Sequence, residues 1–135
     1  MVTVASPSMP KSISMPCLFC SPDRPILVQN EVAYAIADGF PVSPGHTLVI
    51  PKNHAVTIFD LSSTDYAGCF DLVKVVKEIL AREHSPDGFN VGVNCGEAAG
   101  QSVWHAHIHV IPRYKGDVEH PRGGVRHVIP KKGDY

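Results

Sequence analysis

The chain has 135 residues, of which 44% are hydrophobic and 19% are charged, a balance typical of one globular domain rather than a disordered chain. Twelve Lys and Arg residues against 13 Asp and Glu residues give a formal net charge of −1, so we expect no bulk attraction to nucleic acid or an anionic membrane. No apolar run reaches about 18 residues and no charged leader precedes an apolar core, so the sequence predicts neither a membrane span nor export.

The first stretch, residues 1–16, is rich in Ser, Pro and Met and shows no periodicity. We predict a flexible arm there, followed by a single domain over residues 17–135. Of the four cysteines, Cys69 and Cys95 lie in apolar or loop surroundings that do not suggest a disulfide framework. This pattern favours a reducing, cytoplasmic location.

Cys17 and Cys20 form a Cys-x-x-Cys motif whose spacing suits two thiolates on one zinc ion, which needs two further ligands. A thioredoxin-type redox pair is an alternative, but such a motif lies between a strand and a helix, and residues 20–23 do not begin a convincing helix. Two cysteines that only pack are the third possibility. We favour the metal interpretation.

Short apolar runs predict the strands of an antiparallel sheet. Residues 25–29 and 32–37 flank an Asn-Glu turn and suggest a hairpin, and a Pro-Gly turn precedes a strand over residues 46–51. Residues 89–94 and the histidine-rich segment described below complete about five strands.

One helix is predicted from about Ser63 to Glu83, with Ser62 or Ser63 as its N-cap. The apolar face is predicted from residues that recur at helical spacing, namely Phe70, Val73, Val76 or Lys77, and Leu80. Residues 85–88 contain a Pro and a Gly that end the helix. Together these elements predict an α+β fold, with one main helix packed on the sheet and an irregular tail from about residue 114.

Three histidines, His105, His107 and His109, occupy every second position of one segment. In a strand they would share one face in steps of about 6.6 Å, with small and aliphatic residues packing on the other face. Histidines are often structural, but three in register favour a functional site. They could be metal ligands, or a nucleophile with electrostatic helpers at a phosphoryl centre.

The loop before these histidines, residues 94–102, is rich in small residues. Its backbone N–H groups, the Ser102 hydroxyl and the amides of Asn94 and Gln101 could surround a bound anion. Such a loop suits phosphate oxygens, although Gly- and Ala-rich segments also form simple turns.

The segment His105-Ala106-His107-Ile108-His109-Val110-Ile111 resembles the signature of the histidine triad superfamily of nucleotide hydrolases and transferases. The upstream Gly-Gln-Ser-Val and downstream Pro-Arg also match, most closely the fragile-histidine-triad and bacterial dinucleoside polyphosphate hydrolase branches. The likeness runs from about Cys17 to about Arg126 and implies a HIT-like fold and a homodimer.

The resemblance implies that His107 attacks the α-phosphorus of a dinucleoside polyphosphate or nucleoside phosphoramidate and forms a nucleotidyl-imidazole that water hydrolyses. His109 and the loop donors Asn94, Gln101 and Ser102 would meet the charge on the phosphate oxygens. The remaining implied roles are orientation of the other histidines for His46 and the ribose hydroxyls for Asp38. Leu18, Phe19 and Ile36 are suitable walls for a purine pocket, although residues of these types more often belong to the core.

His54, just after a strand, is a spare histidine that could join Cys17, Cys20 and His105 in a closed, structural Cys₂His₂ zinc site. The same set occurs in some bacterial triad proteins, although His54 could equally be a surface residue. Two other functions remain open. A catalytic zinc held by the histidine row would leave the 94–102 loop idle, and the chain could also be a purine-nucleotide-binding module without catalysis.

Overall fold

The computed structural model describes residues 17–135, so the predicted N-terminal arm lies outside the described residues. Five antiparallel strands form one sheet in the order β1-β2-β3-β5-β4. Their bounds are Val28–Gln29 (β1), Ala33–Ala37 (β2), Thr47–Pro51 (β3), Gly88–Gly92 (β4) and Ile108–Arg113 (β5). The predicted α+β class and the five-stranded antiparallel sheet are therefore confirmed.

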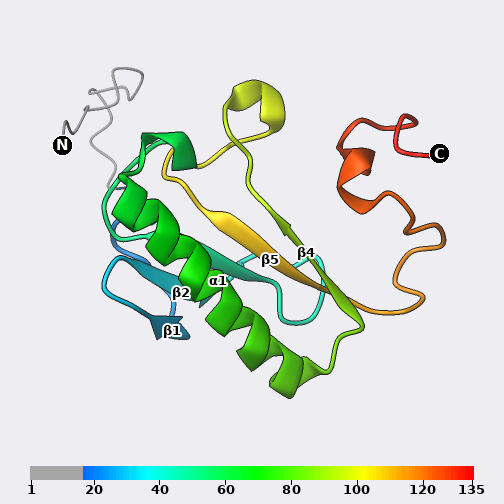
Figure 1. Cartoon of the computed structure of the whole chain (residues 1–135), viewed down its shortest axis with the longest axis horizontal. Helices are drawn as coiled ribbons and strands as arrows, with labels where there is room; N and C mark the ends of the chain where they lie inside the picture. Colours follow the sequence, from blue (N-terminus) through cyan, green and yellow to red (C-terminus); the bar gives the residue numbers. More distant parts are fainter. Residues whose placement is uncertain (1–16) are drawn as a thin grey trace.

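One helix, α1 (Ser63–His84), lies across one face of this sheet (Figure 1). It begins where the Ser62 side chain accepts the Asp65 N–H, and it ends at Ser85, which adopts the left-handed conformation with φ 49°. The apolar face differs from the prediction, because Phe70 and Val73 are only partly buried and Lys77 is exposed. The buried apolar side chains are Cys69, Leu72, Val76 and Leu80, so the prediction is confirmed for Val76 and Leu80 and wrong for the first half of the face.

The core divides into two clusters because both faces of the sheet are covered in part. Between α1 and the sheet, β2, β3 and β5 contribute Ala33, Ala35, Val49, Ile108 and Val110. On the opposite face, which we call the open face, a smaller cluster consists of Phe19, Tyr34, Ile36, Leu48 and Ile50. Phe19 anchors the segment that carries the Cys-x-x-Cys motif, and its carbonyl accepts a hydrogen bond from the Tyr34 hydroxyl.

The histidine segment is only partly a strand, which corrects the prediction. Strand β5 begins at Ile108, so His109 lies in the sheet while His105 and His107 precede it. The pairing explains the limit, because β3 pairs with β5 only as far as Ile108 and β4 only as far as His109. Before Ile108, one backbone–backbone hydrogen bond, from the Ala106 N–H to the Ala55 carbonyl, ties this segment to a neighbouring one.

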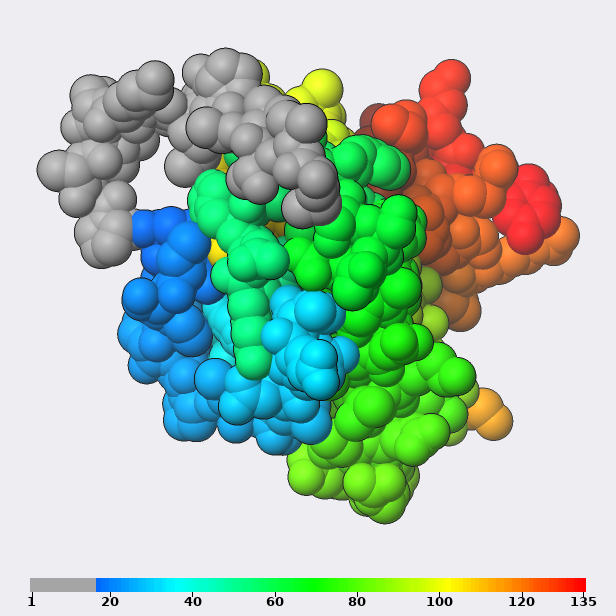
Figure 2. Space-filling model, turned by 60° about the vertical axis from the view of Figure 1, so that its left-hand side comes forward, coloured from blue at the N-terminus to red at the C-terminus, as the bar shows by residue number. Residues whose placement is uncertain are grey.

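The C-terminal segment stands to one side of β4 and projects from the rest of the molecule (Figures 1 and 2). As predicted it is largely irregular, with one short 3₁₀ turn, η3 (Gly124–Val128). The guanidinium groups of Arg122 and Arg126 lie 4.4 and 4.8 Å from the centre of the Tyr135 ring. Within residues 17–135, no helix has the length and apolar character needed to cross a membrane.

Candidate functional site

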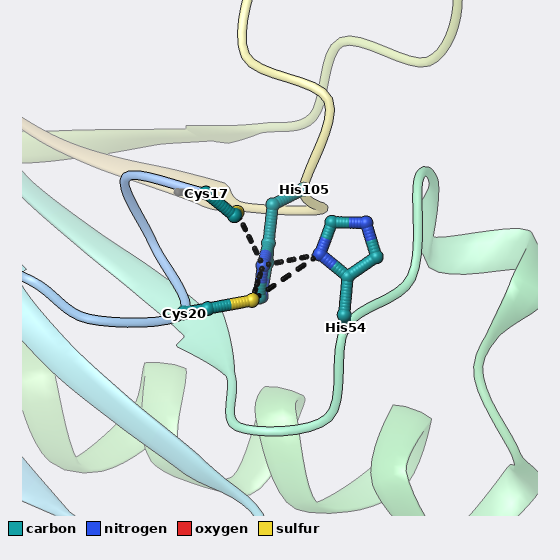
Figure 3. Close-up of side chains that lie close together, drawn as sticks. All are labelled: Cys17, Cys20, His54 and His105. Atoms are coloured by element: carbon teal, nitrogen blue, oxygen red, sulfur yellow. Dashed lines mark hydrogen bonds between the residues drawn. The ribbon is translucent and has the colours of Figure 1, made fainter. Parts of the chain in front are cut away.

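Four side chains from three segments converge on one point (Figure 3). Cys17 and Cys20 come from the first described loop, His54 from the loop after β3, and His105 from the segment before β5. The His105 Nδ1 atom is 3.4 Å from the Cys17 Sγ, 3.5 Å from the Cys20 Sγ and 3.1 Å from the His54 Nδ1. All four potential ligand atoms lie within 4.8 Å of one another.

The chemistry of this cluster fits a tetrahedral zinc site. The fully buried His105 ring lies with its Nε2 2.8 Å from the Pro51 carbonyl, which can only accept, so Nε2 carries the proton and the Nδ1 lone pair faces the cluster. Burial also lowers the pKa of His105 to about 4, which keeps the ring neutral. Two cysteine sulfurs and two neutral imidazoles are the donors that structural zinc prefers.

His107 lies directly beyond this cluster. Its Nδ1 is 2.8 Å from the His105 carbonyl, so Nδ1 carries the proton and the Nε2 atom keeps a free lone pair. The Phe19 ring packs edge-on against the imidazole, with ring centres 5.1 Å apart. A backbone acceptor on one side and an aromatic ring on another hold the His107 imidazole in place, and they leave its Nε2 lone pair available.

His46 and His109 form a hydrogen-bonded pair beside His107. The Val42 backbone N–H donates to the His46 Nδ1 over 3.1 Å, so the proton of a neutral His46 must lie on Nε2. That Nε2 is 3.0 Å from the His109 Nδ1, which therefore accepts, and the proton of a neutral His109 lies on its own Nε2. Burial, with His107 and His46 adding to it, lowers the pKa of His109 to about 4, and burial lowers that of His46.

Asp38 lies against this pair. Its Oδ2 is 3.3 Å from the His46 Nε2 and 3.8 Å from the His109 Nδ1, and its Oδ1 accepts the Phe40 N–H. Two histidines and one carboxylate resemble a metal site, but a backbone N–H cannot accept a hydrogen bond. Since His46 therefore keeps its proton on Nε2, that atom has no lone pair for an ion, and the group forms a hydrogen-bonded set instead.

The loop of residues 94–102 is shaped by glycines and by Gln101. Gly96 and Gly100 have φ values of 94° and 92°, which favour glycine. The buried Gln101 side chain accepts the Gly96 N–H and donates to the Val56 and Val103 carbonyls at 2.6 and 3.0 Å. Both hydrogens of its amide are thus bonded to backbone carbonyls rather than offered to a ligand.

The other loop donors are placed differently. Ser102 is exposed and Asn94 is half-buried, so these two side chains are the ones accessible from solvent. Of the residues expected around a purine, Leu18 is 43% exposed, whereas Phe19 and Ile36 are buried in the open-face cluster. Of these three side chains, only that of Leu18 is exposed to solvent.

The protein-family comparison agrees with this arrangement, since the HIT domain profile matches residues 22–116. The chain belongs to the HIT domain family. An uncharacterized HIT-like protein of Mycoplasma genitalium is 40% identical over 79% of this chain and 79% of its own length. The family resemblance found in the sequence is therefore confirmed.

Two further relatives have named activities. An adenylylsulfatase of Arabidopsis thaliana is 36% identical over 75% of this chain, and an AP-4-A phosphorylase of Mycobacterium tuberculosis is 32% identical over 68%. The match spans 54% and 48% of those proteins, about half of their length.

Solved structures share the fold. A HIT family protein from Bacillus anthracis is 38% identical with a TM-score of 0.71, covering 75% of each chain. A Zn-bound histidine triad family protein from Mycobacterium smegmatis is 37% identical with a TM-score of 0.69, covering 75% of this chain and 77% of its own. A zinc site in this chain is thus supported by the cysteine and histidine cluster and by a relative that binds zinc.

Proposed function

We propose that this protein is a nucleotide hydrolase or transferase that cleaves at the α-phosphorus through a covalent nucleotidyl intermediate on His107. The observation that carries the proposal is the hydrogen bond from the His107 Nδ1 to the His105 carbonyl, because it leaves a fixed lone pair on Nε2. The relatives named as an adenylylsulfatase and an AP-4-A phosphorylase support the same substrate class, a nucleotide with a leaving group on its α-phosphate.

The reaction would proceed in two displacements. The His107 Nε2 lone pair forms a bond to the α-phosphorus while the bond to the leaving group breaks, and the leaving group departs with that electron pair. Water then forms a bond to the same phosphorus, and the phosphorus–nitrogen bond breaks and returns its electron pair to Nε2. The water proton passes to solvent or to a basic oxygen, so the imidazole is regenerated neutral.

The surrounding donors would stabilise the charge that develops on the phosphate oxygens. The His109 Nε2–H is the nearest side-chain donor to His107 in the hydrogen-bonded set, since the two ring centres are 5.2 Å apart. Ser102, Asn94 and the backbone of the 94–102 loop would supply the remaining donors, with Gln101 bracing the loop. His46, whose Nε2–H donates to the His109 Nδ1, would hold His109 in the tautomer that donates from its own Nε2, and Asp38 would accept the ribose hydroxyls of a bound nucleoside.

Zinc would be held by Cys17, Cys20, His54 and His105 and would supply a closed structural cross-link with no coordination position for substrate. Its effect on the chemistry would pass through His105, whose carbonyl positions His107. The resemblance further predicts a cytoplasmic homodimer, and sedimentation of the purified protein would test the oligomeric state.

Mass spectrometry of protein quenched during turnover of a dinucleoside polyphosphate would test the proposal. We expect a nucleotide adduct on His107, and His107→Ala should lose the adduct and turnover while still binding nucleoside monophosphate. His120→Ala is the matched control, because that imidazole side chain is 82% exposed and lies outside the site.

Two results would contradict the proposal. Immediate loss of activity on chelation with the fold intact and no trapped adduct would favour a catalytic zinc. Absence of turnover across nucleotide substrates, with binding retained, would favour a module that only binds nucleotides.

A further inference from the structure

We propose that a second pocket on the open face, which we call the distal pocket, binds the nucleoside on the leaving-group side of a dinucleoside polyphosphate. This inference rests on the function proposed above. The pocket has a volume of about 370 Å³, at the lower end of the range for ligand sites and sized for one part of a substrate. It is lined by Val42, Ser43, Pro44, Asn90, Ile111, Arg113, Tyr114, Asp117 and Val118.

The distal pocket lies on the same face of the sheet as the catalytic histidines. Along β5, His109, Ile111 and Arg113 are half-buried and alternate with buried residues that face α1 or the sheet interior. Ile111 is two residues beyond His109 and four beyond His107, so the pocket begins about 13 Å from the nucleophile along the chain. That distance suits a polyphosphate chain ending in a nucleoside and exceeds the reach of a small leaving group.

The surface between the nucleophile and the pocket is open. Strand β4 pairs Gly92 with His109, Asn90 with Ile111, and Gly88 with Arg113, so these β4 residues share the open face. A Cβ atom added at Gly92 or Gly88 would meet no atom within 4 Å. Gly92, which pairs with His109, therefore leaves a shallow path beside β5 toward Ile111, where the distal pocket begins.

The walls of the pocket suit an uncharged ring rather than a phosphate. Arg113 is neutralised by Asp117, with Nε and Nη2 at 2.7 and 2.8 Å from the two carboxylate oxygens. The Tyr114 hydroxyl donates to the Pro44 carbonyl and the Ser43 hydroxyl to the Pro112 carbonyl. With the charges and hydroxyls engaged internally, what remains is largely aliphatic and aromatic surface.

Polar recognition and the pocket rim fit the same ligand. Among the described residues, the Asn90 side-chain nitrogen makes no hydrogen bond, while its oxygen accepts from Arg113 at 2.6 Å. The amide could therefore donate to a ring nitrogen or carbonyl of a base. Val42, which lines the pocket, is 71% exposed, which is unusual for an apolar side chain and provides surface against which a base can pack.

The test compares two substrates that place the same nucleotide on His107. One is diadenosine tetraphosphate and the other is adenosine phosphoramidate, whose leaving group cannot reach the distal pocket. We expect Val118→Asp, at a pocket residue 47% exposed, to lower the ratio of kcat/KM for the first substrate over the second by about tenfold. The control is Val125→Asp, the same substitution at a valine that is 61% exposed and lies outside the pocket. It should leave this ratio unchanged.

A second variant acts on the path rather than on the pocket. Gly92→Leu places a side chain into open space beside His109, so the sheet should fold, and the same ratio should fall by about tenfold. An unchanged ratio in both variants, with the His107 adduct still formed from both substrates, would overturn the distal pocket alone. If neither substrate forms the adduct in the unmodified protein, the proposed function fails and this inference with it.

Discussion

At the scale of single residues, backbone groups determine which ring nitrogen of each site histidine carries the proton. The Pro51 carbonyl turns the His105 lone pair toward the cysteines, the His105 carbonyl leaves the His107 Nε2 free, and the Val42 N–H fixes His46 as a donor. Each ring nitrogen thereby has one defined role. The sequence pointed to these histidines as site candidates but could not show which nitrogen is protonated, because that depends on main-chain atoms brought together only by folding.

The lowered pKa of His109 predicts how stability depends on pH. The pKa of His109 is about 4 in the folded protein, whereas the pKa of a histidine in an unfolded chain is about 6.5. Between these values the unfolded chain binds a proton that the native state excludes, so the free energy of unfolding falls as pH drops from about 6.5 to 4. The loss from this residue is at most about 3 kcal/mol.

Denaturant unfolding at several pH values would measure the effect. His109→Gln removes the titrating group, so its stability should decline less steeply between about pH 6.5 and 4 than that of the unmodified protein. His120→Gln, at an 82% exposed side chain, should keep the original slope. Parallel curves for the unmodified protein and His109→Gln would contradict the assignment.

At the scale of elements, α1 packs against the β1–β2 hairpin through Gly68. A Cβ atom at this position would lie 2.1 Å from the Val32 Cγ2, and the Gly68 carbonyl accepts a hydrogen bond of 2.8 Å from the Asn30 side chain. Glycine is needed here for space and not for conformational freedom, because the φ of Gly68 lies outside the left-handed range.

Gly68→Ala should therefore destabilise the protein, even though alanine favours helices by about 1 kcal/mol over glycine. Overpacking against Val32 costs about 1–3 kcal/mol, so we expect a net loss of about 1 kcal/mol in thermal or denaturant unfolding. The matched double variant Val32→Ala with Gly68→Ala relieves the contact and should remove most of the loss from the second substitution. A stabilised Gly68→Ala protein would show that the helix shifts at no cost.

The end of α1 allows an opposite prediction. Ser85 has φ 49° and ψ 49°, a left-handed conformation that costs a non-glycine residue about 1 kcal/mol. Ser85→Gly should raise the free energy of unfolding by about 0.5–1 kcal/mol. Ser63→Gly, in the first turn of the same helix, should lower it by a few tenths of a kcal/mol, and equal effects from the two variants would refute the explanation.

Most elements were predictable because their signals are local. Apolar runs and turn residues gave the strands, and Ser62 with the Ser-Pro-Asp-Gly segment gave both ends of α1. The start of β5 was not predictable, because a strand ends where its neighbours stop pairing, and the neighbours of His105 and His107 are distant in sequence. The first half of the buried face of α1 differs from the prediction for a similar reason, because the packing of the helix on the sheet determines which side chains are buried.

At the scale of the whole molecule, the Cys₂His₂ cluster joins three segments that are far apart in the chain. The sequence separations between these segments range from 34 positions, between Cys20 and His54, to 88 positions, between Cys17 and His105. An ion bound by the folded state but not by the unfolded chain stabilises the fold by mass action. Metal content should therefore change the melting temperature.

Zinc at about a hundredfold excess over its dissociation constant should raise the melting temperature of metal-stripped protein by about 10 °C. Cys20→Ser should abolish this shift in melting temperature. Cys69→Ser, which alters a buried cysteine outside the cluster, should lower the melting temperature but retain the zinc-induced shift. An identical shift in Cys20→Ser would place the ion elsewhere.

How much of the site could be foreseen depends on how far apart its parts lie. The Cys-x-x-Cys spacing and the alternating histidines are local patterns, so the candidate metal ligands and the proposed nucleophile could be named from the sequence. The distal pocket had no local signal, because the loop of residues 42–44, β4, β5 and residues 114–118 come together only in the folded protein. The same is true of the inward-facing Gln101, because one of its partners, the Val56 carbonyl, lies in a distant segment.

A peptide group cannot be exchanged by changing a codon. Because two carbonyls and one N–H of the backbone fix the protonation of the imidazoles, the proposed reactive groups would tolerate most side-chain substitutions at Pro51 and Val42. The loops that would bear the substrate have no such protection, and relatives could diverge in preference there while inheriting the same reaction. For an engineer, selectivity is the property to vary in this scaffold, with the chemistry left as it stands.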